Sequence, residues 1–429
     1  MKYLEPNVVV IDDKYSEVMG IIRYYNDKGI GCKYFNADLF EMDAELPPEK
    51  PYSDVNLIFL DLFYSEQPFD PEMPAGWVRR LVHPKTFYVL VLWTKDQSMG
   101  KEVLEILRSK DVMPYIHITK SKKDFVSGPN EYNFAKLFES IDEEINKIPV
   151  LDEILIWKNS LKRTSNVVLG GLVSQNEKEF TNKLKKIIMG HGGKITADSS
   201  DHMRKRSVLF EALDNVLVSN VPQYVSEEEI SKDNESGLYN LNTAEAVAID
   251  EELNSWFHFI LKDDIDSVTS PGVIALNNSE ILKKYYSIQD DLLIKELISH
   301  QQASESTIIE DIVLNITRPC DYAQNKFGKN MKFLSGIAIK KPVRKGNITK
   351  DIKLGSNKFD CVIVFDHLFY NKTDCDLTLI FDFRYSFSIP ENIFRNDFKN
   401  VKMLNKELLS EIQVEYSSYV SRLGYTKII

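Results

Sequence analysis

Three aspartates stand at the carboxyl ends of two short apolar segments in this sequence. Asp12 and Asp13 follow the apolar residues 8–11, and Asp61 follows the apolar residues 57–60. Carboxylates crowded into one site repel each other, and one of them stays protonated unless a cation neutralises the cluster. Mg²⁺ prefers oxygen ligands and needs few protein carboxylates, because it keeps several waters. If the two segments lie side by side, the three aspartates predict a magnesium site.

A hydroxyl and an ammonium group end two more apolar segments of the same kind. Residues 88–93 lead to Thr94, and residues 115–119 lead to Lys120. Short continuous apolar runs are typical of buried parallel strands, and the site of an open α/β sheet lies beyond the carboxyl ends of its strands. The sequence therefore predicts that all these polar groups converge at one edge. Such a set suits phosphoryl transfer, with Asp61 as nucleophile and with Lys120 and Thr94 stabilising phosphoryl oxygens.

The order Asp-Asp, Asp, Thr, Lys at successive strand ends resembles the receiver domain of two-component response regulators, over residues 1–148. The resemblance implies a flavodoxin-like, doubly wound parallel sheet of five strands, Mg²⁺ as cofactor and a histidine kinase as phosphodonor. It also implies a role for each of several residues: phospho-acceptor Asp61; metal ligands Asp13, Asp61 and the Phe63 carbonyl, with Asp12 acting through water; switch hydroxyl Thr94; phosphate partner Lys120; and switching aromatic His117.

Several residues depart from the receiver pattern. Ser121 stands after Lys120 where many receivers have proline, and Lys95 stands after Thr94 where a small residue is usual. The segment 63–82 is longer than the short loop and helix that receivers usually have at this place, and it contains prolines. An inactive receiver-like scaffold is therefore the competing hypothesis for this part of the chain.

The composition predicts a soluble cytoplasmic protein. The chain has 429 residues, 43% hydrophobic and 27% charged, which is enough apolar material for more than one domain. Its formal net charge of −11 argues against broad binding to nucleic acids or anionic membranes. No apolar run approaches the roughly 20 residues of a membrane-spanning helix, and no signal-peptide pattern precedes the first apolar segment. The four cysteines lie far apart without a CxxC pair, so neither a zinc site nor a disulfide framework is indicated.

The spacing of apolar residues changes along the chain and predicts three regions. Residues 1–149 form the receiver-like domain, and residues 150–305, with helical spacing, form a helical connector or output region. Residues 306–429 contain strand-like runs and then an amphipathic stripe, so they are predicted to form a small, mostly antiparallel β unit with a C-terminal helix. The stripe is most simply core packing, with a dimer seam as the alternative; it consists of Leu404, Leu408, Ile412, Tyr416, Tyr419 and Leu423.

The segment around Cys320 is the clearest candidate site in the C-terminal half. Cys320 stands beside Asp321 and near Arg318, at the end of a predicted strand. A nucleophilic cysteine needs a base, usually histidine, and a lowered pKa, and only folding could bring His300 or His367 to it. A structural corner is the simpler interpretation. The Cys-Asp strand end is weakly similar to motifs in poorly characterised bacterial proteins, some linked with defence systems, and this similarity assigns no chemistry.

Residues 318–353 are basic in an otherwise acidic protein. A nucleic-acid or polyphosphate surface is one interpretation. The other is a set of solvated hairpin lysines, or a patch that docks an acidic surface of the same chain. The sequence has no helix-turn-helix pattern with a basic recognition helix, so an ordinary transcription-factor output is disfavoured. Nucleic acid is not the expected partner, and the basic stretch keeps it open as an alternative.

The sequence as a whole predicts a cytoplasmic response regulator that accepts a phosphoryl group on Asp61. Residues 150–429 are expected to act through contacts with a protein output partner or through a homodimer, without catalysis and without a membrane. The alternatives left open are a phosphate-sink receiver, an effector enzyme whose site in residues 306–390 is gated by the receiver, and the inactive scaffold.

Overall fold

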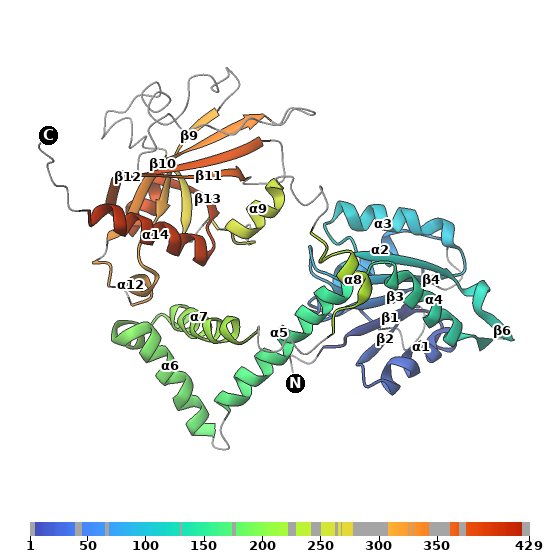
Figure 1. Cartoon of the computed structure of the whole chain (residues 1–429). Helices are drawn as coiled ribbons and strands as arrows, with labels where there is room; N and C mark the ends of the chain where they lie inside the picture. Colours follow the sequence, from blue (N-terminus) through green and yellow to red (C-terminus); the bar gives the residue numbers. More distant parts are fainter. Residues whose placement is uncertain are drawn as a thin grey trace, which may run out of the picture. The chain divides into compact units, whose positions relative to one another are not determined.

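The computed structural model divides the chain into two compact units, Met1–Leu155 with Ser231–Asn234, and Ile156–Ile230 with Glu235–Ile429 (Figure 1). Each unit is described by itself. The residues that the structure describes are 5–38, 45–64, 68–128, 131–173, 177–221, 229–241, 250–261, 265–266, 268–277, 308–324, 326–328, 330–342, 361–368 and 375–422.

The first unit is built on a parallel sheet whose strands are short and apolar, as the sequence predicts. The strands are β1 (Val8–Asp12), β2 (Cys32–Asn36), β3 (Leu57–Leu60), β4 (Val89–Thr94) and β5 (Ile116–Ser121). Their order is β2-β1-β3-β4-β5, and every neighbouring pair is parallel. This is the flavodoxin-like, doubly wound order, in which ligands bind where the strand order reverses, between β1 and β3. The predicted fold class is confirmed.

Helices cover both faces of this sheet, which explains why its strands are apolar on both sides. The helices are α1 (Tyr15–Asp27), α2 (Glu72–Leu81), α3 (Gly100–Ser109) and α4 (Phe134–Asn146), with short helices η1 (Gln97–Met99) and η2 (Lys122–Phe125) and a hairpin of β6 (Val126–Gly128) and β7 (Glu131–Tyr132). One buried cluster joins α1 and α4 to one face of the sheet, and a second joins α2 and α3 to the other. The strand ends are thereby held in fixed relative positions.

The chain continues as a series of helices: α5 (Val150–Leu172), α6 (Glu177–Asp198), α7 (His202–Asn220), α8 (Lys232–Ser236) and α9 (Glu251–His258). Helical geometry breaks inside α6 at Gly193, whose φ of 70° is a left-handed conformation that glycine adopts readily. The predicted helical character is confirmed for these five segments. Among the described residues, no helix combines the length and the apolarity needed to cross a membrane.

The second unit contains a six-stranded sheet with the order β11-β12-β10-β9-β8-β13, in which all described pairs are antiparallel. Its strands are β8 (Val273–Asn277), β9 (Ile308–Asn315), β10 (Asn330–Pro342), β11 (Val362–Leu368), β12 (Cys375–Pro390) and β13 (Phe398–Met403); its helices are α12 (Pro319–Ala323), α13 (Glu391–Asp397) and α14 (Lys406–Val420). Strand β8 comes from the region predicted to be helical throughout. Its five residues are too short a run for apolar periodicity to separate strand from helix.

The C-terminal helix α14 packs its apolar stripe against this sheet. Leu408, Ile412 and Tyr416 are buried in the same cluster as Leu404 and the strands. Tyr419 packs at the edge of that cluster, and Leu423 lies outside the described residues. Core packing, the simpler of the two interpretations of the stripe, therefore accounts for its described residues.

Candidate functional site

Three carboxylates meet at the carboxyl edge of the parallel sheet, at the point where the strand order reverses. Asp12 ends β1, Asp13 follows it, and Asp61 follows β3. One carboxylate oxygen of each lies within 4.8 Å of the others. Asp12 and Asp61 are 0% and 3% exposed, whereas Asp13 is partly exposed. The register explains the convergence, because Ile11 of β1 pairs with Leu60 of β3 and places both strand ends at one level.

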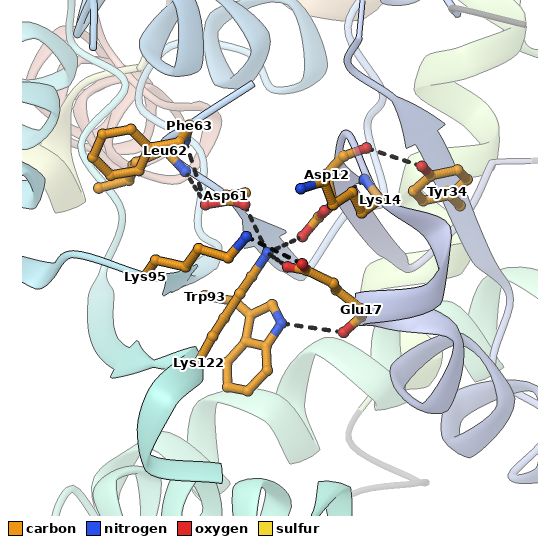
Figure 2. Close-up of polar contacts among 10 residues, drawn as sticks. All are labelled: Asp12, Lys14, Glu17, Tyr34, Asp61, Leu62, Phe63, Trp93, Lys95 and Lys122. Carbon is orange, nitrogen blue, oxygen red and sulfur yellow. Dashed lines mark hydrogen bonds and ion pairs between the residues drawn. The ribbon is translucent and has the colours of Figure 1, made fainter. Parts of the chain in front are cut away.

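One lysine is buried among these carboxylates. The Lys122 ammonium lies 2.7 Å from Asp12 Oδ2, 2.6 Å from Asp61 Oδ2 and 2.7 Å from Glu17 Oε2 (Figure 2). Lys122 is only 1% exposed. A lysine ammonium has three N–H donors, so all the donors of Lys122 are used by carboxylates.

The lysine at the site is Lys122, two residues beyond the residue that the sequence suggested. Strand β5 runs to Ser121, not to residue 119, and Ser121 pairs with Thr94 at the end of β4. Lys120 is therefore still inside the strand, beside Trp93, and its charge helps to lower the pKa of Glu144 on α4. The apolar run ends before the strand does, because the hydrogen-bonded ladder continues through polar residues.

Glu17, in the first turn of α1, is a fourth carboxylate that sequence reasoning missed. Its Oε1 lies 3.1 Å from the ammonium of Lys95, and its Oε2 contacts Lys122. Its backbone oxygen also accepts a long hydrogen bond from Trp93 Nε1, at 3.4 Å. Burial alone would raise the pKa of Glu17, but the hydrogen bonds and charges of Lys122 and Lys95 outweigh it and lower that pKa. Its only sequence signal was an acid in the first turn of the helix that follows Asp12 and Asp13.

Burial and charge shape the protonation of this network. Burial raises the pKa of Asp12 to about 8, against the lowering effect of the Lys122 charge, and Asp61 raises it further. Burial also raises the pKa of Asp61. Burial alone would lower the pKa of Lys122, but the charges of Asp12 and Asp61 raise it. Lys122 therefore keeps its proton, and further positive charge is needed before Asp12 and Asp61 both ionise at neutral pH.

Backbone amides fix the orientation of the two buried aspartates. Asp61 Oδ1 accepts hydrogen bonds from the amides of Leu62, at 2.7 Å, and Phe63, at 3.4 Å. Asp12 Oδ1 accepts one from the amide of Lys14, at 2.8 Å. Each carboxylate therefore has one oxygen held by backbone and the other by Lys122 (Figure 2).

The Thr94 hydroxyl is a buried polar group at the carboxyl edge of the sheet. Thr94 is 0% exposed at the end of β4, and its Oγ1 has no hydrogen-bond partner among the described residues. An unsatisfied buried hydroxyl costs about 1–3 kcal/mol, so it needs an explanation. A ligand oxygen bound at this edge of the sheet would provide the missing partner.

His117 is exposed on β5, where it pairs in register with Leu90. The position is inside the strand and several residues short of the carboxyl edge. Its assignment as a switching aromatic depended on Lys120 being the phosphate partner, and it stays a prediction.

The segment around Cys320 forms a corner between the helices and the sheet of the second unit. Cys320 is exposed in α12, and its Sγ lies 3.9 Å from Asp321 Oδ1. The next turn of this segment is held by α7, because Arg204 donates a 3.1 Å hydrogen bond to the Ala323 carbonyl. Arg318 precedes the helix at its N-cap. His300 and the side chain of His367, the two histidines considered as bases, lie outside what the structure describes.

The basic stretch is described only in part. The Lys340 ammonium lies 2.8 Å from Glu310 Oε2, and the Lys332 ammonium lies 4.5 Å from the centre of the Tyr416 ring. These two lysines therefore contact residues of their own unit. Lys329, Arg344, Lys345, Lys350 and Lys353 lie outside the described residues, as does the side chain of Lys341.

No protein-family model and no curated protein matches this sequence. Among solved structures, the chain is similar to an adenylate cyclase from Rhodopirellula baltica, with 14% identity and a TM-score of 0.21, over 35% of this chain and 93% of that one. It is also similar to a fusion protein carrying the yeast Spc42 trimeric coiled coil, with 14% identity and a TM-score of 0.20, over 40% of this chain and 100% of that one. Similarity at this level carries no argument about fold or function.

Proposed function

We propose that the first unit is a response-regulator receiver that accepts a phosphoryl group on Asp61 in the presence of Mg²⁺, with a histidine kinase as donor. One observation carries the proposal: Asp12, Asp13, Asp61, Lys122 and the unpartnered Thr94 hydroxyl share the carboxyl edge of a β2-β1-β3-β4-β5 sheet. These are the group types that an aspartyl-phosphate site needs. Lys122 takes the role that the sequence suggested for Lys120, and the position three residues before it is then Thr119 in place of His117.

The donor set fits Mg²⁺. Asp12, Asp13 and Asp61 offer carboxylate oxygens close enough to share one cation, and Mg²⁺ favours such ligands together with water. The partly exposed Asp13 leaves the site open on one side. The four carboxylates, Glu17 included, face two ammonium groups, so one divalent cation would balance the remaining charge. Bound there with the Phe63 carbonyl, the ion would supply charge neutralisation for the incoming phosphoryl group.

The residues of the site then have distinct roles in the transfer. An oxygen of the Asp61 carboxylate attacks phosphorus, the bond from phosphorus to the donor breaks, and its electron pair leaves with the donor. Lys122 has to exchange one carboxylate contact for a phosphoryl oxygen, because its three donors are already used. Glu17 is the contact easiest to release, since it is the most exposed of the three and has Lys95 as a second partner. The Thr94 hydroxyl donates to another phosphoryl oxygen.

The Mg²⁺ affinity of the protein is expected to rise with pH between about 6 and 8 and to level off above. The pKa of Asp12 lies near 8, so protons compete with the metal below that pH, by up to about tenfold per pH unit. Because the pKa of Asp12 is higher in the folded protein, its protonated carboxyl stabilises the metal-free protein at low pH. This contribution to the free energy of unfolding is lost as pH rises from 3.8 through about 8. Isothermal titration calorimetry in buffers of different ionisation enthalpy measures both affinity and released protons. If the Mg²⁺ affinity did not change between pH 6 and 8, the assignment of Asp12 as a metal ligand would be wrong.

The direct test is phosphorylation of the purified chain. Incubation with Mg²⁺ and acetyl phosphate is expected to add one phosphoryl group by intact mass, and the same reaction with EDTA is expected to add none. Hydroxylamine should remove the group, because an acyl phosphate reacts with it and a phosphoserine does not. A folded protein that gains nothing from acetyl phosphate or from a panel of histidine kinases would refute the proposal.

The inactive scaffold is the alternative that one observation favours. Lys122 already has all its donors paired in this structure, so the network is complete in a form without a phosphoryl group. The phosphorylation test separates the two, because a scaffold would not react. For residues 150–429 we keep a protein-contact output as the proposal.

A further inference from the structure

A buried tyrosine hydroxyl near the three aspartates has no role in the site as described so far. Tyr64 comes three residues after Asp61 and is 6% exposed. Its ring packs in the cluster of Leu62 and Trp77, between the sheet and α2. Its hydroxyl has no hydrogen-bond partner among the described residues. Tyrosine hydroxyls that are buried usually have a partner.

Tyr64 belongs to the loop that carries the site residues beyond β3, because it follows Phe63, whose amide donates to Asp61 Oδ1. Burial raises the pKa of Tyr64 well above its usual value, and the charges of Asp61, Asp12 and Asp13 raise it further. These are the three carboxylates whose oxygens converge. The phenol therefore belongs to the same loop as Asp61 and interacts electrostatically with the three carboxylates that would hold the cation.

The chemistry at that position selects a partner for the hydroxyl. Mg²⁺ retains several of its waters when protein carboxylates bind it, and those waters need hydrogen-bond partners inside the protein. A neutral phenol can accept from a metal-bound water and donate to a neighbouring carboxylate. The ring is held by core packing, so the hydroxyl is positioned before the metal arrives.

We propose that Tyr64 is an outer-sphere ligand of Mg²⁺, holding a metal-bound water through its hydroxyl. The inference rests on the metal site proposed above and adds a residue to it. Outer-shell partners of metal ligands are commonly worth 10–100-fold in metal affinity. Tyr64 acts through the hydration shell, so it is a positioning residue for the metal.

The test is the Tyr64→Phe variant of the full chain, which deletes only the hydroxyl. Its Mg²⁺ affinity, measured by calorimetry near pH 8, is expected to fall about tenfold. Its thermal midpoint in EDTA is expected to stay the same or to rise, because the deleted hydroxyl has no hydrogen-bond partner among the residues that the structure describes. If the hydroxyl had a structural role, the variant would have a lower thermal midpoint in EDTA and an unchanged Mg²⁺ affinity.

Tyr88→Phe is the matched control. Tyr88 is buried in the same cluster, but its hydroxyl donates to the Val112 carbonyl. This variant is expected to lower the thermal midpoint in EDTA and to leave Mg²⁺ affinity unchanged. If Tyr64→Phe behaves like it, or binds Mg²⁺ as tightly as wild type, the inference is wrong. Wild-type protein that binds no Mg²⁺ would instead refute the metal site itself.

Discussion

The Asp61→Asn variant is expected to lose the phosphoryl gain that Mg²⁺ and acetyl phosphate produce in the wild-type protein. The amide keeps the shape of the side chain but lacks the nucleophilic oxygen anion, so no acyl phosphate forms. Asp124→Asn is a suitable control, because Asp124 follows β5 at the same edge and is exposed. It should gain the group like wild type. If the Asp61→Asn protein still gained a phosphoryl group, the acceptor would be another residue. Peptide mapping after borohydride reduction would identify that residue.

The same variant is expected to change the pH dependence of stability in EDTA. The pKa of Asp61 is raised by burial, so its ionisation opposes folding and the metal-free wild type loses stability as pH rises through that pKa. Asparagine removes the titration. The variant should therefore lose less stability than wild type as pH rises above the range in which carboxyl groups ordinarily titrate. Urea unfolding at several pH values measures the free energy of unfolding of both proteins. If that free energy fell with pH equally in both, burial would not raise the pKa of Asp61 and the interpretation would be wrong.

Lys122→Met is expected to destabilise the first unit strongly at pH 8 in EDTA. Methionine preserves much of the aliphatic length but removes the ammonium that pairs with Asp12, Asp61 and Glu17. Removing one partner of a buried ion pair costs about 3–5 kcal/mol, because a charge stays buried without compensation. The loss should shrink toward pH 5, which is well below the pKa of about 8 at Asp12, and also in excess Mg²⁺, which would neutralise the same carboxylates.

Hydrogen–deuterium exchange measured on peptides from β1 and β3 reports this loss in the first unit alone. Lys120→Met is the matched control, two residues away in the sequence. Lys120 is partly exposed, and its charge lowers the pKa of Glu144 less than Lys147 does, so its removal should cost at most about 1 kcal/mol. If Lys120→Met destabilised β1 and β3 and Lys122→Met did not, the assignment of the site lysine would be reversed.

Much of the parallel-sheet unit follows from local sequence patterns. Strands β1, β3 and β4 consist mainly of short apolar runs. Asp12, Asp13 and Asp61 could be placed at one edge because side chains at the carboxyl ends of parallel strands must meet there. Strand β8 could not be assigned, because its run of four apolar residues fits a helix as well as a strand, and only pairing with β9 and β13 decides between them.

The amino-acid sequence by itself determined the sheet class and three of the acidic groups, because apolar runs and strand-end positions are local properties of the chain. Tertiary structure decided which cation joins them. Residues 120 and 122 are both lysines, so residue type alone does not distinguish them. Strand β5 extends to Ser121 by pairing with β4, and this brings Lys122 to the carboxyl edge of the sheet. Glu17 enters from a helix, where its place in the first turn is its one local signal, and Tyr64 enters from a loop without such a signal. Their roles depend on burial and on neighbours distant in sequence, which exist only once the chain has folded.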